Sequence, residues 1–136
     1  MSHYTRTTTR LSNESALVAA LAAMGFPDVE CHEQPATLYG YRGDARKDRA
    51  NVIIRRKHIG GASNDVGFAR TPEGDFVAII SEFDARHFDT NWLRQLAVEY
   101  AKATVNEFAT QNGWSTADAP EIEEDGTVRL TLRRSI

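Results

Sequence analysis

One long segment, Thr90 to Asn112, has the residue spacing of a helix and constrains the fold more than any other part of the chain. Asp89 or Thr90 can cap its start, and Gly113 suits the left-handed position that commonly ends a helix. Its apolar residues form two stripes, which predicts burial on more than one side. The first stripe is Leu93, Leu96, Tyr100 and Ala103, and the second is Val98, Ala101, Val105 and Phe108.

A shorter helix is predicted near the N-terminus, where Leu17 and Leu21 recur at helical spacing among several alanines. Ser12 or Asn13 can accept hydrogen bonds from the free amides at its start. Gly25 is the expected end, because it is followed by a proline two residues later that cannot continue a helix.

The rest of the chain is typical of strands and turns. Asp125-Gly126 favours a tight hairpin, and Thr71 to Gly74 predicts another turn. Gly43 to Asn51 and His58 to Asp65 are polar and predict mobile loops. The predicted strands are Tyr4 to Thr9, Val29 to His32, Val52 to Ile54, Val66 to Arg70, Phe76 to Ile80 and Thr127 to Arg133. This order predicts a single α+β domain over residues 1–136, with a mostly antiparallel β-sheet and two helices packed on it.

Composition narrows the class of protein. The 136 residues carry 16 Lys and Arg against 19 Asp and Glu, a net charge of -3 that argues against a protein that coats nucleic acid. The mean hydropathy is -0.45 and no apolar run is long enough to span a membrane, so we expect a cytoplasmic protein. The single cysteine, Cys31, excludes an internal disulfide and lies at an apolar strand position, which predicts a buried thiol. No motif indicates a cofactor.

A basic segment between Arg42 and Lys57 is the first candidate site. Arg42 follows Tyr41, and Arg55 follows the apolar run of a predicted strand. Guanidinium groups bind phosphate oxygens in pairs, and aromatic rings stack on bases. Arg42, Arg55, Tyr41 and Lys57 therefore form a candidate anion, nucleotide or RNA site. The alternative is a solvated strand face, since charged side chains also protect sheet edges from aggregation.

A second candidate site precedes the long helix, where Glu82, Asp84, His87 and Asp89 could hold a divalent metal ion. The alternative interpretation is a polar loop that ends in a helix N-cap.

A third candidate is an interface on the long helix. Trp92, Val98, Val105 and Trp114 could anchor a protein partner or a second copy of the chain, since aromatic residues dominate the energetics of interfaces.

Several segments, taken in order, resemble one protein family. They are Met1 to Thr5, Tyr39 to Gly43, Val52 to Arg55, Asp65 to Phe68, Glu99 to Ala101 and Gly126 to Arg134. The set is similar to the family called hypothetical chloroplast reading frame thirty-five, or domain of unknown function twelve fifty-seven. The resemblance implies a small protein of bacteria and plastids, without established catalytic residues, whose genes often neighbour an AAA+ ATPase.

Three functional hypotheses follow. The first is a non-enzymatic accessory or adaptor protein that binds a protein partner or itself, and the family resemblance suggests an AAA+ ATPase as the partner. The second is an anion, nucleotide or RNA-binding module that uses the Arg42 to Lys57 segment. The third is a metal-dependent enzyme at Glu82, Asp84 and His87. The first is preferred because no group of residues meets the requirements of an active site.

Overall fold

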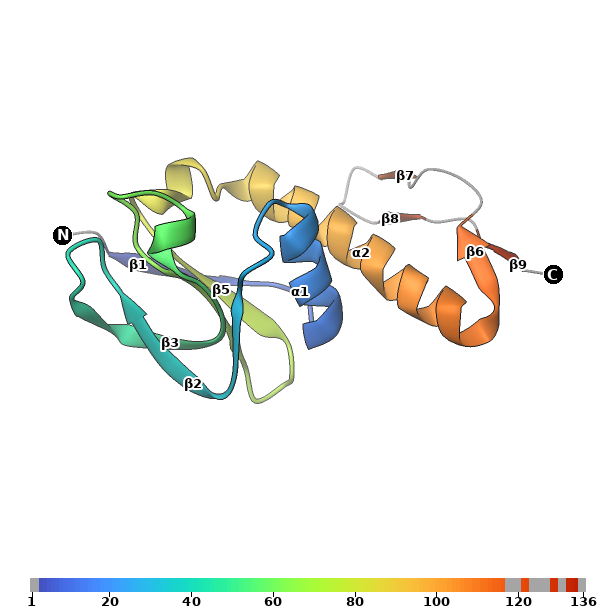
Figure 1. Ribbon diagram of the computed structural model, residues 1–136, viewed down its shortest axis with the longest axis horizontal. Coiled ribbons are helices and arrows are strands. Elements are labelled where there is room, and N and C mark those ends of the chain that lie inside the picture. The colour runs from blue at the N-terminus through green and yellow to red at the C-terminus, as the bar shows by residue number, and fades with distance from the viewer. Residues whose placement is uncertain (1–2, 117–120, 123–127, 130–131, 135–136) are drawn as a thin grey trace.

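A five-stranded antiparallel sheet forms the centre of the computed structural model, which describes residues 3–116, 121–122, 128–129 and 132–134 (Figure 1). The strands lie side by side in the order β1-β5-β4-β3-β2. Their bounds are β1 (Tyr4–Thr8), β2 (Glu30–Tyr39), β3 (Ala45–Ile54), β4 (Val66–Arg70) and β5 (Phe76–Ser81). With two helices, this arrangement confirms the predicted α+β class.

Both helices begin and end where local chemistry predicts. The helix α1 (Glu14–Ala23) starts at Asn13, whose side chain accepts a hydrogen bond from the Ala16 amide at 3.1 Å. The helix α2 (Thr90–Asn112) starts at Asp89, which accepts from the Trp92 amide at 2.9 Å. It ends at Gly113, whose φ of 72° is the left-handed conformation. The predicted caps and bounds of α2 are therefore confirmed.

One face of the sheet is covered by both helices. Leu17 and Leu21 of α1 and Leu96 of α2 are fully buried in the same cluster as Phe68 and Phe76 of the sheet. Removing such apolar surface from water is the main driving force for this packing. The two helices are thereby fixed relative to the sheet, and α2 continues beyond it (Figure 1).

The sheet is strongly curled around its other face. β1 and β3 are separated by two strands, which would put them about 14 Å apart in a flat sheet. Even so, Arg6 of β1 forms an ion pair with Asp48 of β3 at 3.5 Å, and the guanidinium of Arg46 lies 5.5 Å from the centre of the Tyr4 ring. The concave face encloses a second cluster of Leu38, Ala50, Ile53, Ala69 and Ile79.

Of three further local predictions, two were wrong and one was confirmed. The predicted loop at Gly43 to Asn51 is mostly strand, because β3 begins at Ala45 and pairs antiparallel with β2 from that residue. The loop predicted at His58 to Asp65 is confirmed as irregular backbone from Ile59 onward, and the Arg56 side chain donates to the carbonyls of Ser63 and Gly61 at 2.9 and 2.7 Å. Cys31 is exposed, because β2 is an edge strand with an irregular register after this residue.

Four short strands follow α2. β6 (Trp114–Thr116) pairs with β9 (Leu132–Arg134), and β7 (Glu121–Ile122) pairs antiparallel with β8 (Val128–Arg129). The second pair confirms the predicted C-terminal hairpin, whose turn at Asp125-Gly126 lies outside the described residues. The alternation of residues in the predicted strand Thr127 to Arg133 also predicts that Val128, Leu130 and Leu132 face inward, but these side chains lie outside that description. Neither helix, as far as the structure describes the chain, combines the length and apolar character that a membrane crossing needs.

Candidate functional site

Arg55 is held between two carboxylates at the end of β3. Its Nε and Nη2 donate to the two carboxylate oxygens of Glu30 at 2.8 and 2.9 Å. Its Nη1 donates to Asp65 Oδ2 at 2.8 Å and to the Thr37 carbonyl at 2.9 Å. The Arg55 side chain is only 18% exposed, and Asp65 is 1% exposed. This paired geometry is the strongest form of a charge-assisted hydrogen bond.

The ion pairs change the pKa values of both partners. Hydrogen bonds from Arg55 are the largest cause that lowers the pKa of Glu30, to about 2, although partial burial of the carboxyl opposes them. The bonds to Glu30 and then to Asp65 raise the pKa of Arg55 above its already high ordinary value. Arg55 is therefore a permanent cation whose charge is balanced inside the fold.

The contacts of Arg55 leave it largely unavailable for the predicted anion site. Four of the five N–H donors of Arg55 are engaged, so it acts as an internal ion-pair partner rather than as a free phosphate ligand. Arg42 is exposed, with its guanidinium 5.3 Å from the centre of the Tyr41 ring, and Lys57 is exposed on the short 3₁₀ helix η1 (Arg56–His58). Anion binding by Arg42, Tyr41 and Lys57 stays a prediction.

Asp65 also ties together segments that are distant in the chain. Its Oδ1 accepts from the Arg56 amide and its Oδ2 from the Tyr39 amide, both at 2.8 Å. Its backbone carbonyl accepts from the Tyr4 hydroxyl at 2.8 Å. Burial, followed by the nearby Asp65 charge, raises the pKa of that hydroxyl, so Tyr4 stays protonated and keeps donating.

A second buried carboxylate lies next to this group. Asp84 is 3% exposed, and its Oδ2 accepts from the Ser81 hydroxyl at 2.7 Å and from the Asn64 amide at 2.9 Å. The Asn64 side-chain nitrogen donates to both Asp84 and Ser81. Through these hydrogen bonds Asp84 connects the end of β5 to the loop before β4. They also satisfy a carboxylate that is buried, as buried polar groups generally require.

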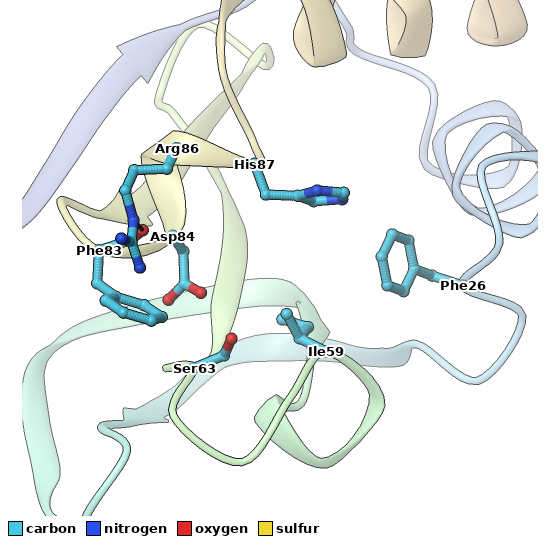
Figure 2. A pocket seen from close by; sticks show the side chains of 7 residues that line it. All are labelled: Phe26, Ile59, Ser63, Phe83, Asp84, Arg86 and His87. Atoms are coloured by element: carbon cyan, nitrogen blue, oxygen red, sulfur yellow. Dashed lines mark hydrogen bonds between the residues drawn. The ribbon is translucent and has the colours of Figure 1, made fainter.

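A pocket of about 410 Å³ opens above Asp84 (Figure 2). In Figure 2, His87 and Phe26 lie on one side of the opening, and Asp84, Phe83 and Arg86 lie on the other. Arg86 stacks on the Phe83 ring at 4.1 Å and donates to the Phe83 carbonyl. The full lining is Phe26, Ile59, Ser63, Phe83, Asp84, Arg86 and His87.

The predicted metal ligands are not arranged as a metal site. Within the described residues, no three His, Cys, Asp or Glu side chains come close enough to hold a metal ion. Asp84 binds Asn64 and Ser81, and Asp89 caps α2. Glu82, Asp84 and His87 therefore do not form the predicted set of metal ligands in this structure.

A groove with a volume of about 640 Å³ lies between β1 and α2. Leu11, Leu93 and Leu96 give it an apolar floor, and Arg10 and Arg94 are exposed at its walls. The described residues that line it include no carboxylate. Sequence reasoning missed this groove because its two sides are distant in the chain and neither arginine belongs to a motif. The lining is Thr7, Thr8, Thr9, Arg10, Leu11, Thr90, Leu93, Arg94, Leu96 and Ala97.

The predicted interface residues occupy different environments. Trp92 is 9% exposed and lies edge-on to Phe88, with the ring centres 4.6 Å apart. Val98 is buried, Val105 is half-buried, and the side chain of Trp114 is outside what the structure describes. The core of the chain thus already uses Trp92 and Val98, and an interface role for the four residues stays a prediction.

Comparison with known proteins identifies two matches. A family described as "Protein of unknown function (DUF1257)" matches residues 20–131. The uncharacterized protein ycf35 of Cyanophora paradoxa is 25% identical over 135 residues, which cover 98% of each chain. No solved structure matches the chain significantly.

Proposed function

The chain belongs to the DUF1257 family, and we propose that it acts as an accessory protein that binds a partner protein through the groove between β1 and α2. The observation that carries this proposal is the composition of the groove. It combines an apolar floor with two exposed arginines, beside the open edge of a sheet. Apolar contacts supply affinity in such sites, and charges at the wall select the partner.

The other candidate sites support a structural role better than a chemical one. Arg55 and Asp65 form ion pairs within the fold, and Asp84 is bound to Asn64 and Ser81. Reactive groups in an active site have to reach a substrate, whereas the hydrogen bonds of these groups go to other protein atoms, although Asp84 also lines a pocket. Of the predicted anion-binding residues, Arg42, Tyr41 and Lys57 are exposed and remain accessible to a ligand. The AAA+ ATPase suggested by the family resemblance is the first partner to test.

Affinity purification from the native host tests this proposal. The tagged chain, the double variant Arg10→Glu/Arg94→Glu and the control Arg49→Glu are compared for the proteins that they retain. Arg49 is exposed on β3, away from the groove lining. We expect the wild-type chain and the control to retain similar amounts of the same partner. The double variant should retain about tenfold less of it. Equal recovery with all three chains would refute binding in the groove.

A further inference from the structure

We propose that the groove binds an extended segment of the partner, which pairs with the edge of β1 as an added strand and directs acidic side chains to Arg10 and Arg94. This inference rests on the proposed function and specifies the partner's chemistry. Strand addition at an open sheet edge is a common mode of peptide recognition, in which main-chain hydrogen bonds give affinity and side-chain pockets give specificity.

The edge of β1 is the first observation that supports strand addition. β1 is the last strand of the sheet, with β5 on one side only. The Thr9 amide donates to β5, and the His3 carbonyl accepts from the residue after β5. Because backbone groups alternate in direction along an antiparallel strand, the amides and carbonyls of Arg6 and Thr8 face away from β5. These groups are available to an added strand.

The position of the open edge sets the length of the segment. Side chains at the start of β1 already contact β3, through the Arg6–Asp48 ion pair and the Arg46 guanidinium near the Tyr4 ring. The groove begins at Thr7 and runs past the end of β1 to Leu11. An added strand would therefore pair with few residues, so its affinity must also come from side chains that reach α2.

The side chains that line the groove select an apolar and acidic segment. Leu93 is half-buried on α2 beside the groove floor, where alternate apolar side chains of an added strand would lie. Arg10 and Arg94 are exposed, and neither forms an ion pair with a described residue. By contrast, Arg6 and Arg55 have carboxylate partners within the chain. Carboxylates of the partner would form ion pairs with the two arginines and so balance their charge.

Peptide titrations of the full chain, followed by the NMR shifts of its backbone amides, test this inference. The probe is a capped heptapeptide with leucine or glutamate at every second position and threonine between them, so that both kinds of side chain project from the face of the added strand that lies toward α2. Its controls replace glutamate with lysine, or carry N-methyl groups on alternate backbone nitrogens. We expect the glutamate peptide to shift the amides of Arg6, Thr8 and Leu93. It should bind about tenfold more tightly than the lysine peptide, and more weakly as salt rises from about 50 to about 300 mM.

A charge reversal separates this mode from nonspecific attraction. In Arg10→Glu/Arg94→Glu the preference should invert toward the lysine peptide, whereas Arg49→Glu should keep the wild-type preference. The N-methylated peptide should bind at least about tenfold more weakly, since it cannot pair with β1. Equal binding of the parent and N-methylated peptides, or no binding by either charged peptide, would overturn strand addition. If the partner were still lost from the double variant in affinity purification, the proposed function would stand without it.

Discussion

At the scale of single residues, Arg55 is the counter-ion of the buried Asp65 carboxylate. It neutralises Asp65, which is 1% exposed, and it binds Glu30 through two parallel hydrogen bonds. Asp65 in turn holds the amides of Tyr39 and Arg56. Removing the arginine would leave a buried carboxylate without its counter-ion, which costs more than the ion pair itself contributes.

Arg55→Ala should therefore destabilise the chain strongly, by about 3 to 5 kcal/mol of unfolding free energy. Arg42→Ala removes the same side chain from an exposed position and should change that free energy by about 0.5 kcal/mol or less. Urea denaturation of both variants measures the difference. Similar stabilities of the two variants would show that Arg55 is a surface residue in solution.

The Glu30 carboxyl predicts a specific dependence of stability on pH. Its pKa in the folded chain is lowered to about 2, below the ordinary value of 4.5. A lowered pKa means that the folded state favours the ionised form, so Glu30 contributes fully above about pH 4.5 and loses its contribution as the pH falls toward about 2. The effect is modest because the side chain is 41% exposed.

Urea midpoints measured from about pH 5 down to about pH 2 check this dependence. The wild-type chain should lose stability over that range, and Glu30→Gln should lose less of it because the titrating group is absent. An identical pH slope for both chains would contradict the Glu30–Arg55 pairing.

The partners of Arg55 also explain why its role could not be read from the sequence. Glu30 and Asp65 are 25 and 10 residues away from it in the chain, and they approach only when β2, β3 and the loop before β4 come together. An arginine after an apolar run fits a ligand site and an internal ion pair equally well. Nothing in the local pattern distinguishes the two.

At the scale of elements, agreement between sequence and structure follows the range of the interactions. The ends of α2 depend on Asp89 and Gly113, which act within one helical turn, and both were predictable. The polar start of β3 is held as a strand by pairing with β2, Ala45 with Tyr39 and Arg49 with Thr37, and the Asp48 side chain also pairs with Arg6 of β1. The charged residues of β3 therefore resembled a loop in sequence, although they form a strand in the structure.

The curl of the sheet depends on one close approach. A Cβ atom on Gly67 would lie 2.5 Å from the Cβ of Ala50 and 3.0 Å from a methyl group of Leu38. Both neighbours belong to the cluster that the concave face encloses, and the Ala50 Cβ is fixed to the backbone. The absence of a side chain at Gly67 thus allows β2 and β3 to close over β4.

Gly67→Ala should destabilise the chain by about 1 to 3 kcal/mol, because the backbones must separate to admit the methyl group. Gly61→Ala is the matched control, since a Cβ there would meet no atom within 4 Å. Thermal unfolding of the two variants compares them. An unchanged melting temperature for Gly67→Ala would contradict the tight closure of the sheet.

At the scale of the whole molecule, the candidate binding groove forms where the helix α2 packs against the sheet beside β1. The groove joins Thr7 to Leu11 with Thr90 to Ala97, two segments that come together because α2 packs beside the sheet. Helical periodicity correctly predicted the burial of Leu96 and Val98 of α2, although Phe108 of the second stripe is exposed, and it could not show which strand edge would lie next to the helix. The fold class was therefore predictable from local patterns, whereas the groove required the assembled structure.

Amide hydrogen exchange, resolved by residue and compared between the free chain and its purified complex, tests the central claim most directly. In the free chain, the amides of Arg6 and Thr8 should exchange faster than those of Thr5 and Thr7, which face β5. In the complex, Arg6, Thr8 and Leu93 should become protected. Unchanged exchange at Arg6 and Thr8, with protection elsewhere on the surface, would show that the partner does not bind along β1.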